Sequence, residues 1–203
     1  MKKAFLILAA ILLATAVSAQ NHEKNILGVR AGLNLSSYSI SESGVSLSTD
    51  SRASFHVAVV DQILLCNRLP FYLETGLAFS SRGGKVSGVS FRPSYLQIPV
   101  LVNYHFNIKD IVTIQPFAGL YYGFGIGGKV KAGGEKGDIF GDEGGLKRSD
   151  LGVRLGAGVV WNRIYFGLGY DIGCLNLAKD VLTNGGDGTM RNNCFTISVG
   201  YNF

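Results

Sequence analysis

Apolar and polar residues alternate with a period of two along most of the chain after its first twenty residues. The last segment shows the pattern clearly, because one of its faces carries only Phe195, Ile197, Val199, Tyr201 and Phe203. Such alternation is typical of a β-strand with one apolar face. Eight segments of this kind predict eight strands, over residues 27–38, 53–63, 71–82, 94–106, 113–127, 149–161, 164–176 and 193–203.

The connections between these segments alternate between short and long. Short links fall near residues 65–70, 107–112 and 162–163, and long polar links fall near residues 39–52, 83–93, 128–148 and 177–192. Short turns at one end, long loops at the other and an even strand number are typical of bacterial outer-membrane barrels. We therefore predict an all-β fold, an eight-stranded antiparallel up-and-down transmembrane β-barrel with both termini in the periplasm. Ten strands would result if the VSLST stretch in the 39–52 loop extended into an additional hairpin.

The first residues of the chain have the features of an export signal. Lys2 and Lys3 precede an apolar stretch, and the small residues Val17, Ser18 and Ala19 precede Gln20. This order predicts a secretory signal peptide over residues 1–19 and one barrel domain over residues 20–203. No later stretch is apolar enough for a transmembrane helix, so the exposed apolar surface must belong to strands.

Composition and charge narrow the possible partners. The chain has 203 residues, of which 28 are glycine and 16% are charged, which argues against both a helical bundle and a disordered chain. Without Lys2 and Lys3 there are 17 Lys and Arg against 14 Asp and Glu, a net charge of +3. Because this excess is small and the protein is exported, we expect no nucleic-acid partner.

If apolar residues face lipid, the opposite face of each strand lines the lumen. In an eight-stranded barrel the lumen is just wide enough to be filled by side chains. A two-residue turn at Asn162 and Arg163 pairs Trp161 with Ile164, which places Arg154 directly opposite Asp171. The predicted lumen network consists of Arg30, Asn34, His56, Gln62, Glu74, Arg82, Gln97, Asn103, His105, Gln115, Arg154 and Asp171.

The sequence offers aromatic, cysteine and histidine candidates outside this pairing. Aromatic residues near the short turns, Phe71, Tyr104, Phe106 and Trp161, predict an interfacial girdle. A disulfide between Cys174 and Cys194 would join adjacent strands, but strand parity puts them on opposite faces, so it needs a bulge or fraying. Cys66 would remain unpaired.

No cofactor, metal or catalytic group is expected. His56 and His105 are predicted to lie far apart along the barrel, and no third ligand accompanies them. The G-x-G-x-x-G match at residues 123–128 does not open a helix, and Gly119, Gly123, Gly125 and Gly127 are instead assigned to the lumen face. The acidic, glycine-rich stretches at 128–148 and 185–188 are predicted to be solvated loops rather than cation sites.

Three segments carry a family resemblance: GVRAGLNLS at 28–36, SSRGGK at 80–85 and YLQIPVLVNYHF at 95–106. They resemble the PorT-like outer-membrane β-barrel family of Bacteroidetes-type bacteria, over nearly the whole mature chain. This resemblance implies a barrel but no particular activity. The terminal Tyr201 and Phe203 look like the C-terminal signal for outer-membrane insertion, which implies the barrel-assembly machinery as a partner.

Three classes of function fit these observations. The first is a non-enzymatic barrel with a filled lumen, acting in envelope structure or binding an extracellular or envelope protein through its long loops. The second is a narrow pore for small solutes, which needs a water path past Arg30, Glu74 and Arg154. The third is a soluble lipocalin-like carrier, whose apolar faces would point inward.

Overall fold

The computed structural model describes residues 25–42, 45–65, 69–86, 89–109, 111–132, 135–140, 145–179 and 188–203. The predicted signal peptide and Cys66 lie outside these residues. The described residues form one antiparallel sheet of twelve strands. The strands are β1 (Asn25–Glu42), β2 (Val45–Ser48), β3 (Asp50–Leu64), β4 (Phe71–Ser81), β5 (Gly84–Val86), β6 (Val89–Tyr104), β7 (Phe106–Ile108), β8 (Val112–Ala132), β9 (Glu135–Asp138), β10 (Ser149–Trp161), β11 (Ile164–Gly173) and β12 (Thr189–Asn202).

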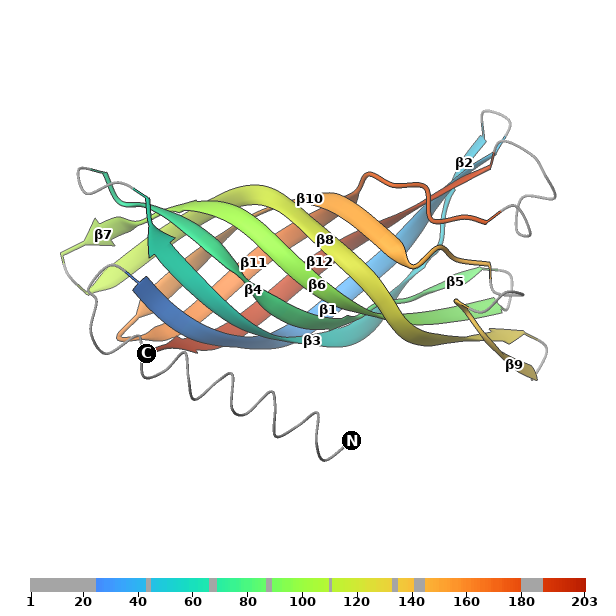
Figure 1. Cartoon of the computed structure of the whole chain (residues 1–203), viewed down its shortest axis with the longest axis horizontal. Helices are drawn as coiled ribbons and strands as arrows, with labels where there is room; N and C mark the ends of the chain where they lie inside the picture. The colour runs from blue at the N-terminus through green and yellow to red at the C-terminus, as the bar shows by residue number, and fades with distance from the viewer. Residues whose placement is uncertain are drawn as a thin grey trace.

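Eight long strands close into a ring (Figure 1). Its order is β1, β3, β4, β6, β8, β10, β11 and β12, and β12 pairs again with β1. The prediction of an eight-stranded antiparallel barrel is therefore confirmed. A closed ring leaves no edge strand with unpaired backbone groups. A strand in lipid needs this, because lipid cannot form hydrogen bonds with such groups.

The four short strands extend the long ones beyond the ring. β2 folds back on the end of β1 and leads into β3, with Ser39 opposite Ser48 and Ser36 opposite Arg52. β5, β7 and β9 extend neighbouring strands in the same way. The alternative of ten strands is wrong, because VSLST lengthens an existing hairpin and adds no new strand to the ring.

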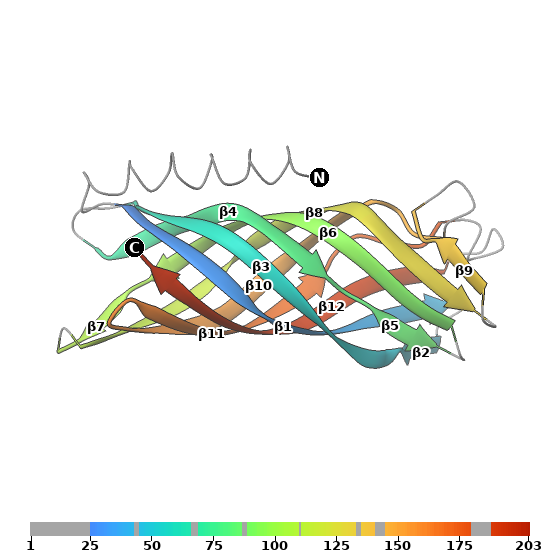
Figure 2. The ribbon, with the colours of Figure 1, turned by 90° about the horizontal axis from the view of Figure 1, so that it is seen from below.

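The two ends of the barrel differ. Asn162 and Arg163 form a two-residue turn with positive φ angles of 44° and 73°, as expected for a tight hairpin whose twist matches its strands. This turn, the start of β1 and the C-terminus lie together at what we call the short-turn end (Figure 2). The hairpins of β2, β5 and β9 project from the opposite, loop end (Figure 1).

The outer wall is apolar and the interior is polar. Alternate residues of β11 are exposed and buried over its whole length, so Phe166, Leu168 and Tyr170 point outward while Tyr165 and Asp171 point inward. Interior glycines leave space for large side chains, and a Cβ at Gly152 would lie 2.6 Å from the Tyr121 ring. This orientation is the reverse of what a lipocalin-like carrier needs, so the carrier alternative is not supported.

No helix among the described residues is long and apolar enough to cross a membrane.

Candidate functional site in the barrel lumen

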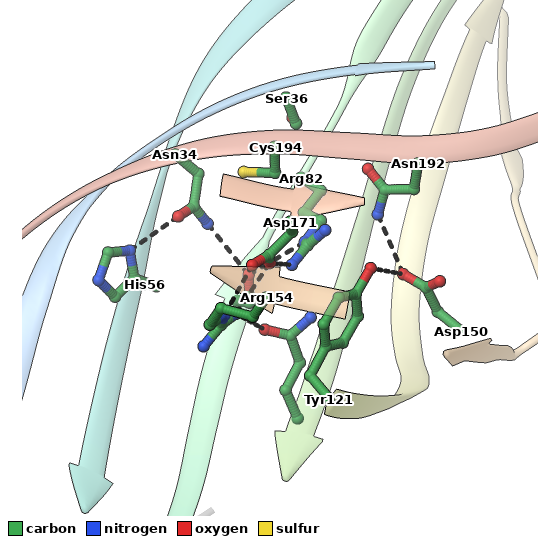
Figure 3. A network of polar contacts seen from close by, with 12 residues as sticks. Asn34, Ser36, His56, Arg82, Tyr121, Asp150, Arg154, Asp171, Asn192 and Cys194 are labelled. Atoms are coloured by element: carbon green, nitrogen blue, oxygen red, sulfur yellow. Dashed lines mark hydrogen bonds and ion pairs between the residues drawn. The ribbon is translucent and has the colours of Figure 1, made fainter. Parts of the chain in front are cut away.

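Two arginines share one buried carboxylate in the lumen (Figure 3). Arg154 on β10 and Asp171 on β11 are directly opposite, the register that the two-residue turn predicts. Arg154 Nε donates to Asp171 Oδ1 at 2.6 Å, and its Nη2 donates to Oδ2 at 2.8 Å. Arg82 Nη2 donates to the same Oδ2, and neither its side chain nor that of Asp171 is exposed.

The contact between Arg82 and Asp171 spans the barrel. Arg82 directly follows β4, and β4 lies four strands from β11 in either direction around the eight-stranded ring. Strands at that separation form opposite walls. We call Arg82, Asp171 and Arg154 the ion bridge, and it crosses the lumen from wall to wall.

Polar contacts continue on both sides of the ion bridge. Toward the loop end, Asp150 accepts hydrogen bonds from Tyr121 Oη at 3.4 Å and from Asn192 Nδ2 at 3.1 Å. Asn34 also lies next to the ion bridge, and its Nδ2 donates to Ser80 Oγ at 3.0 Å. His56 Nδ1 lies 2.7 Å from Asn34 Oδ1, and Figure 3 shows this pair beside the ion bridge.

A second polar group lies toward the short-turn end. Glu74 Oε2 accepts hydrogen bonds from Gln62 Nε2 at 2.6 Å and from Asn103 Nδ2 at 3.0 Å. Gln62 also reaches Gln115, at 3.4 Å. The Arg30 guanidinium lies over the Tyr165 ring, 3.8 Å from its centroid.

A cavity of about 60 Å³ lies between these groups. Arg30, Glu74 and Arg154 all line it, together with His56 and Ser198. It has room for a few water molecules, since about 10–15 Å³ of such space is enough to hold one. These are the residues that a narrow pore was predicted to use. Arg154 also belongs to the ion bridge, and its partner Asp171 lies six residues beyond the lining residue Tyr165, toward the loop end of β11.

Apolar side chains from the loops and from the ends of the strands are buried together at the loop end. A Cβ at Gly125 would lie 2.4 Å from the Phe140 ring, so this ring covers the inner face of β8. Leu146 and Ala178 form an antiparallel bridge, and Lys147 N donates to Leu177 O at 2.8 Å. We call this cluster the apolar cap; it consists of Tyr38, Tyr95, Ile139, Phe140, Leu146, Leu177, Ala178 and Met190.

The apolar cap was missed by the sequence analysis. The prediction of a solvated loop over 128–148 is wrong for Ile139, Phe140 and Leu146, which are nearly fully buried. These residues follow no period, so the pattern that reveals strands does not reveal them. The adjacent Ile139 and Phe140 in an otherwise polar, glycine-rich stretch were the available signal.

The remaining predicted residues lie as follows. Gln97 is buried and accepts a hydrogen bond from Arg154 Nη2 at 3.3 Å. His105 stacks on Tyr72 near the short-turn end, whereas His56 bonds to Ser198 Oγ at 3.0 Å. The two histidines are therefore not brought together. The described residues contain no group of three or more His, Cys, Asp or Glu side chains that could hold a metal ion.

The possible disulfide between Cys174 and Cys194 is not formed. Both residues are free thiols, with Cys174 exposed on the outer wall and Cys194 buried in the lumen. No bulge brings them to the same face, since Cys194 pairs in regular register with Asp171 and Ser36.

The predicted girdle residues cluster at the short-turn end. The Tyr104 ring contacts Phe71 and Phe106, with centroids 4.8 and 4.3 Å apart. Phe106 and Trp161 are both more than half exposed. The terminal Tyr201 and Phe203 form a further pair on the outer wall, 5.3 Å apart.

Several solved structures are similar to this chain. Neisserial surface protein A superposes with a TM-score of 0.51 at 14% identity, covering 87% of this chain and 97% of that chain. Ail of Yersinia pestis gives 0.48 at 14% identity, with 90% and 100% covered. OprG from Pseudomonas aeruginosa gives 0.47 at 14% identity, with 91% and 98% covered.

A search of curated protein sequences found no match. The family model described as "outer membrane protein beta-barrel domain" matches residues 7–203, nearly the whole chain. The protein therefore belongs to the outer membrane protein β-barrel domain family.

Proposed function

We propose that this outer-membrane barrel is closed and non-enzymatic, and that it acts in envelope structure or through its loop-end hairpins rather than by transporting solutes. The observation that carries this proposal is the ion bridge across the lumen, from Arg82 on one wall to Asp171 on the other. A solute or ion passing through the barrel would have to separate these charges.

Two features make that separation unfavourable. Breaking one side of a buried ion pair leaves an uncompensated charge, which typically costs about 3–5 kcal/mol. The apolar cap lies beyond the ion bridge, and an apolar constriction resists filling by water. The cavity next to Arg30 and Glu74 is therefore better explained as an enclosed, water-filled chamber than as part of a channel through the barrel.

The direct test is conductance. The refolded barrel would be inserted into planar lipid bilayers, and folding would be verified by the mobility shift between unboiled and boiled samples in SDS gels. We expect no stepwise current above the bare bilayer. Stable unit steps from the folded, inserted protein would instead identify a narrow pore.

Several finer assignments complete the proposal. We place both termini in the periplasm, with Phe71, Tyr104, Phe106 and Trp161 at the inner interface, because the short-turn end of such barrels faces the periplasm. Residues 1–19 act as the export signal, and Tyr201 and Phe203 are read by the barrel-assembly machinery. We also group the chain with the PorT-like barrels, because of its segments 28–36, 80–85 and 95–106. Protease digestion of whole cells should cleave the loop-end hairpins and leave an epitope tag at the C-terminus intact.

A further inference from the structure

Four exposed cations gather on the outer wall at the loop end. They lie on three adjacent strands, β5, β6 and β8, and we call them the basic strip: Lys85, Arg92, Lys129 and Lys131. Arg92 and Lys129 are directly opposite, while Lys85 and Lys131 are both cross-strand partners of Ser90. Figure 1 shows β5 beside the ends of β6 and β8.

No ion pair with a described side chain neutralises this strip. Like charges directly opposite each other on a sheet are destabilising, and Arg92 and Lys129 have this arrangement. Asp50 and Asp138 are cross-strand neighbours of Lys85 and Lys129. Within the part of the chain that the structure describes, however, the ion pairs are those of Asp171, and neither aspartate forms one with the strip.

The strip continues the lipid-facing wall. On β6 and β7, exposed apolar side chains run from Phe106 to Leu96. At about 3.3 Å per residue and a tilt of about 40°, this stretch is about 25 Å tall, the height of a barrel's apolar band. Arg92 shares the face of Leu96 and lies four residues further on, which places it about 10 Å beyond the band. That is the level of lipid headgroups.

Two further cations lie near the loop end: Arg52 on β3, whose Nη1 donates to Ser90 Oγ at 3.1 Å beside the strip, and Arg148, which is exposed just before β10. Ser149 at the start of β10, Cys174 after β11 and Ser37 on β1 are uncharged. Arg191 on β12 is exposed but stands opposite Ser39, with no second cation as its cross-strand partner. The strip differs from these single cations because Arg92 and Lys129 stand directly opposite each other.

We propose that the basic strip binds the phosphate groups of an anionic lipid in the outer leaflet, whose acyl chains lie on the apolar wall of β6 and β8. Phosphate oxygens form charge-assisted hydrogen bonds with guanidinium and ammonium groups, and they relieve the repulsion between Arg92 and Lys129. The continuity of cations and apolar wall favours a lipid over a soluble anion. The inference uses the outer-membrane location and does not depend on whether the lumen conducts.

The test is a titration of the refolded full-length barrel with lipid A, a bisphosphorylated glycolipid, followed by native mass spectrometry. The double variant Arg92→Gln, Lys129→Gln removes two cations, each worth about one kcal/mol near an anionic lipid surface, so we expect about thirtyfold weaker binding. Arg191→Gln is the matched control and should leave binding unchanged. The unboiled gel shift verifies that each variant is folded.

Three results would overturn the proposal. One is equal binding by the wild type and the double variant, or an equal loss in Arg191→Gln. Another is equal affinity for lipid A whose phosphates have been removed, which would assign binding to the acyl chains alone. The third is full displacement by a soluble sulfated polysaccharide with the same dependence on Arg92 and Lys129, which would identify a soluble polyanion as the ligand. None of these three results depends on whether the barrel conducts, so they test the lipid site independently of the proposed function.

Discussion

Asp171 is the residue on which the lumen network depends most. Its carboxylate neutralises Arg82 and contacts Arg154, so Asp171→Ala leaves two cations without their partner. We expect a loss of about 3–5 kcal/mol in the free energy of unfolding, the usual effect of breaking a buried pair. Urea titration of the barrel in lipid vesicles measures it. Asp138→Ala, at an exposed carboxylate, is the control and should change stability by less than about 0.5 kcal/mol. Equal midpoints for the two variants would contradict the ion bridge.

For single residues, contacts between neighbouring strands could be predicted from the sequence, whereas contacts across the lumen could not. The pairing of Arg154 with Asp171 follows from the turn at Asn162, because a two-residue hairpin determines the register of its strands. The contact of Arg82 with Asp171 joins residues 89 positions apart on opposite walls. No turn determines which residues meet across the lumen. The alternation of faces along β4 could therefore predict that Arg82 points into the lumen, but not that it contacts Asp171.

Among the elements, β4 contains a close approach that only glycine allows. Gly76 has φ of +154°, and a Cβ there would lie 2.1 Å from the carbonyl oxygen of Val59. It stands where β4 passes Pro99 of β6, which has no N–H to donate. We expect Gly76→Ala to destabilise the barrel by about 1–3 kcal/mol, measured by urea titration.

The matched control for this substitution is Gly127→Ala on β8. A Cβ at Gly127 would have no atom within 4 Å, so the same chemical change meets no obstacle there. We expect Gly127→Ala to leave the unfolding midpoint near that of the wild type. If both alanine variants lose equal stability, the close approach at Gly76 is not the cause.

The outer face of β10 tests the assignment of the lipid side. Leu155 is 45% exposed in the middle of the strand, and Leu155→Arg would place a charge in the hydrocarbon region. We expect a loss of about 2–4 kcal/mol in lipid vesicles. Ile111→Arg, in the exposed short turn outside the band, should cost about 1 kcal/mol or less. A neutral Leu155→Arg would mean that the outer wall does not face lipid.

The elements were more predictable than the loops, for a physical reason. Strands such as β11 alternate between lipid and lumen at every residue, so a period of two reveals both their existence and their faces. The loop residues Ile139 and Leu146 are buried in one cluster with Leu177 and Met190, which are distant in sequence. Nothing periodic marks such contacts, and the apolar cap emerged only from the structure.

For the whole molecule, the lumen has two successive barriers, the ion bridge and the apolar cap. Replacing Arg82, Asp171 and Arg154 together by serine removes the bridge without leaving an unpaired charge, so the barrel should still fold. Replacing Leu146 and Leu177 together by serine makes the cap polar.

Because the barriers lie in series, opening one leaves the other in place. We therefore expect each variant to be silent in planar bilayers and only the combined five-residue variant to show stepwise current. The unboiled gel shift of each variant controls for folding, and a matched membrane fraction from empty cells controls for contaminating porins. Current from the serine bridge variant alone would show that the cap is permeable and that the ion bridge is the sole barrier. Silence from the folded five-residue variant would place a further block at the short-turn end, where Gln62 and Asn103 hold Glu74.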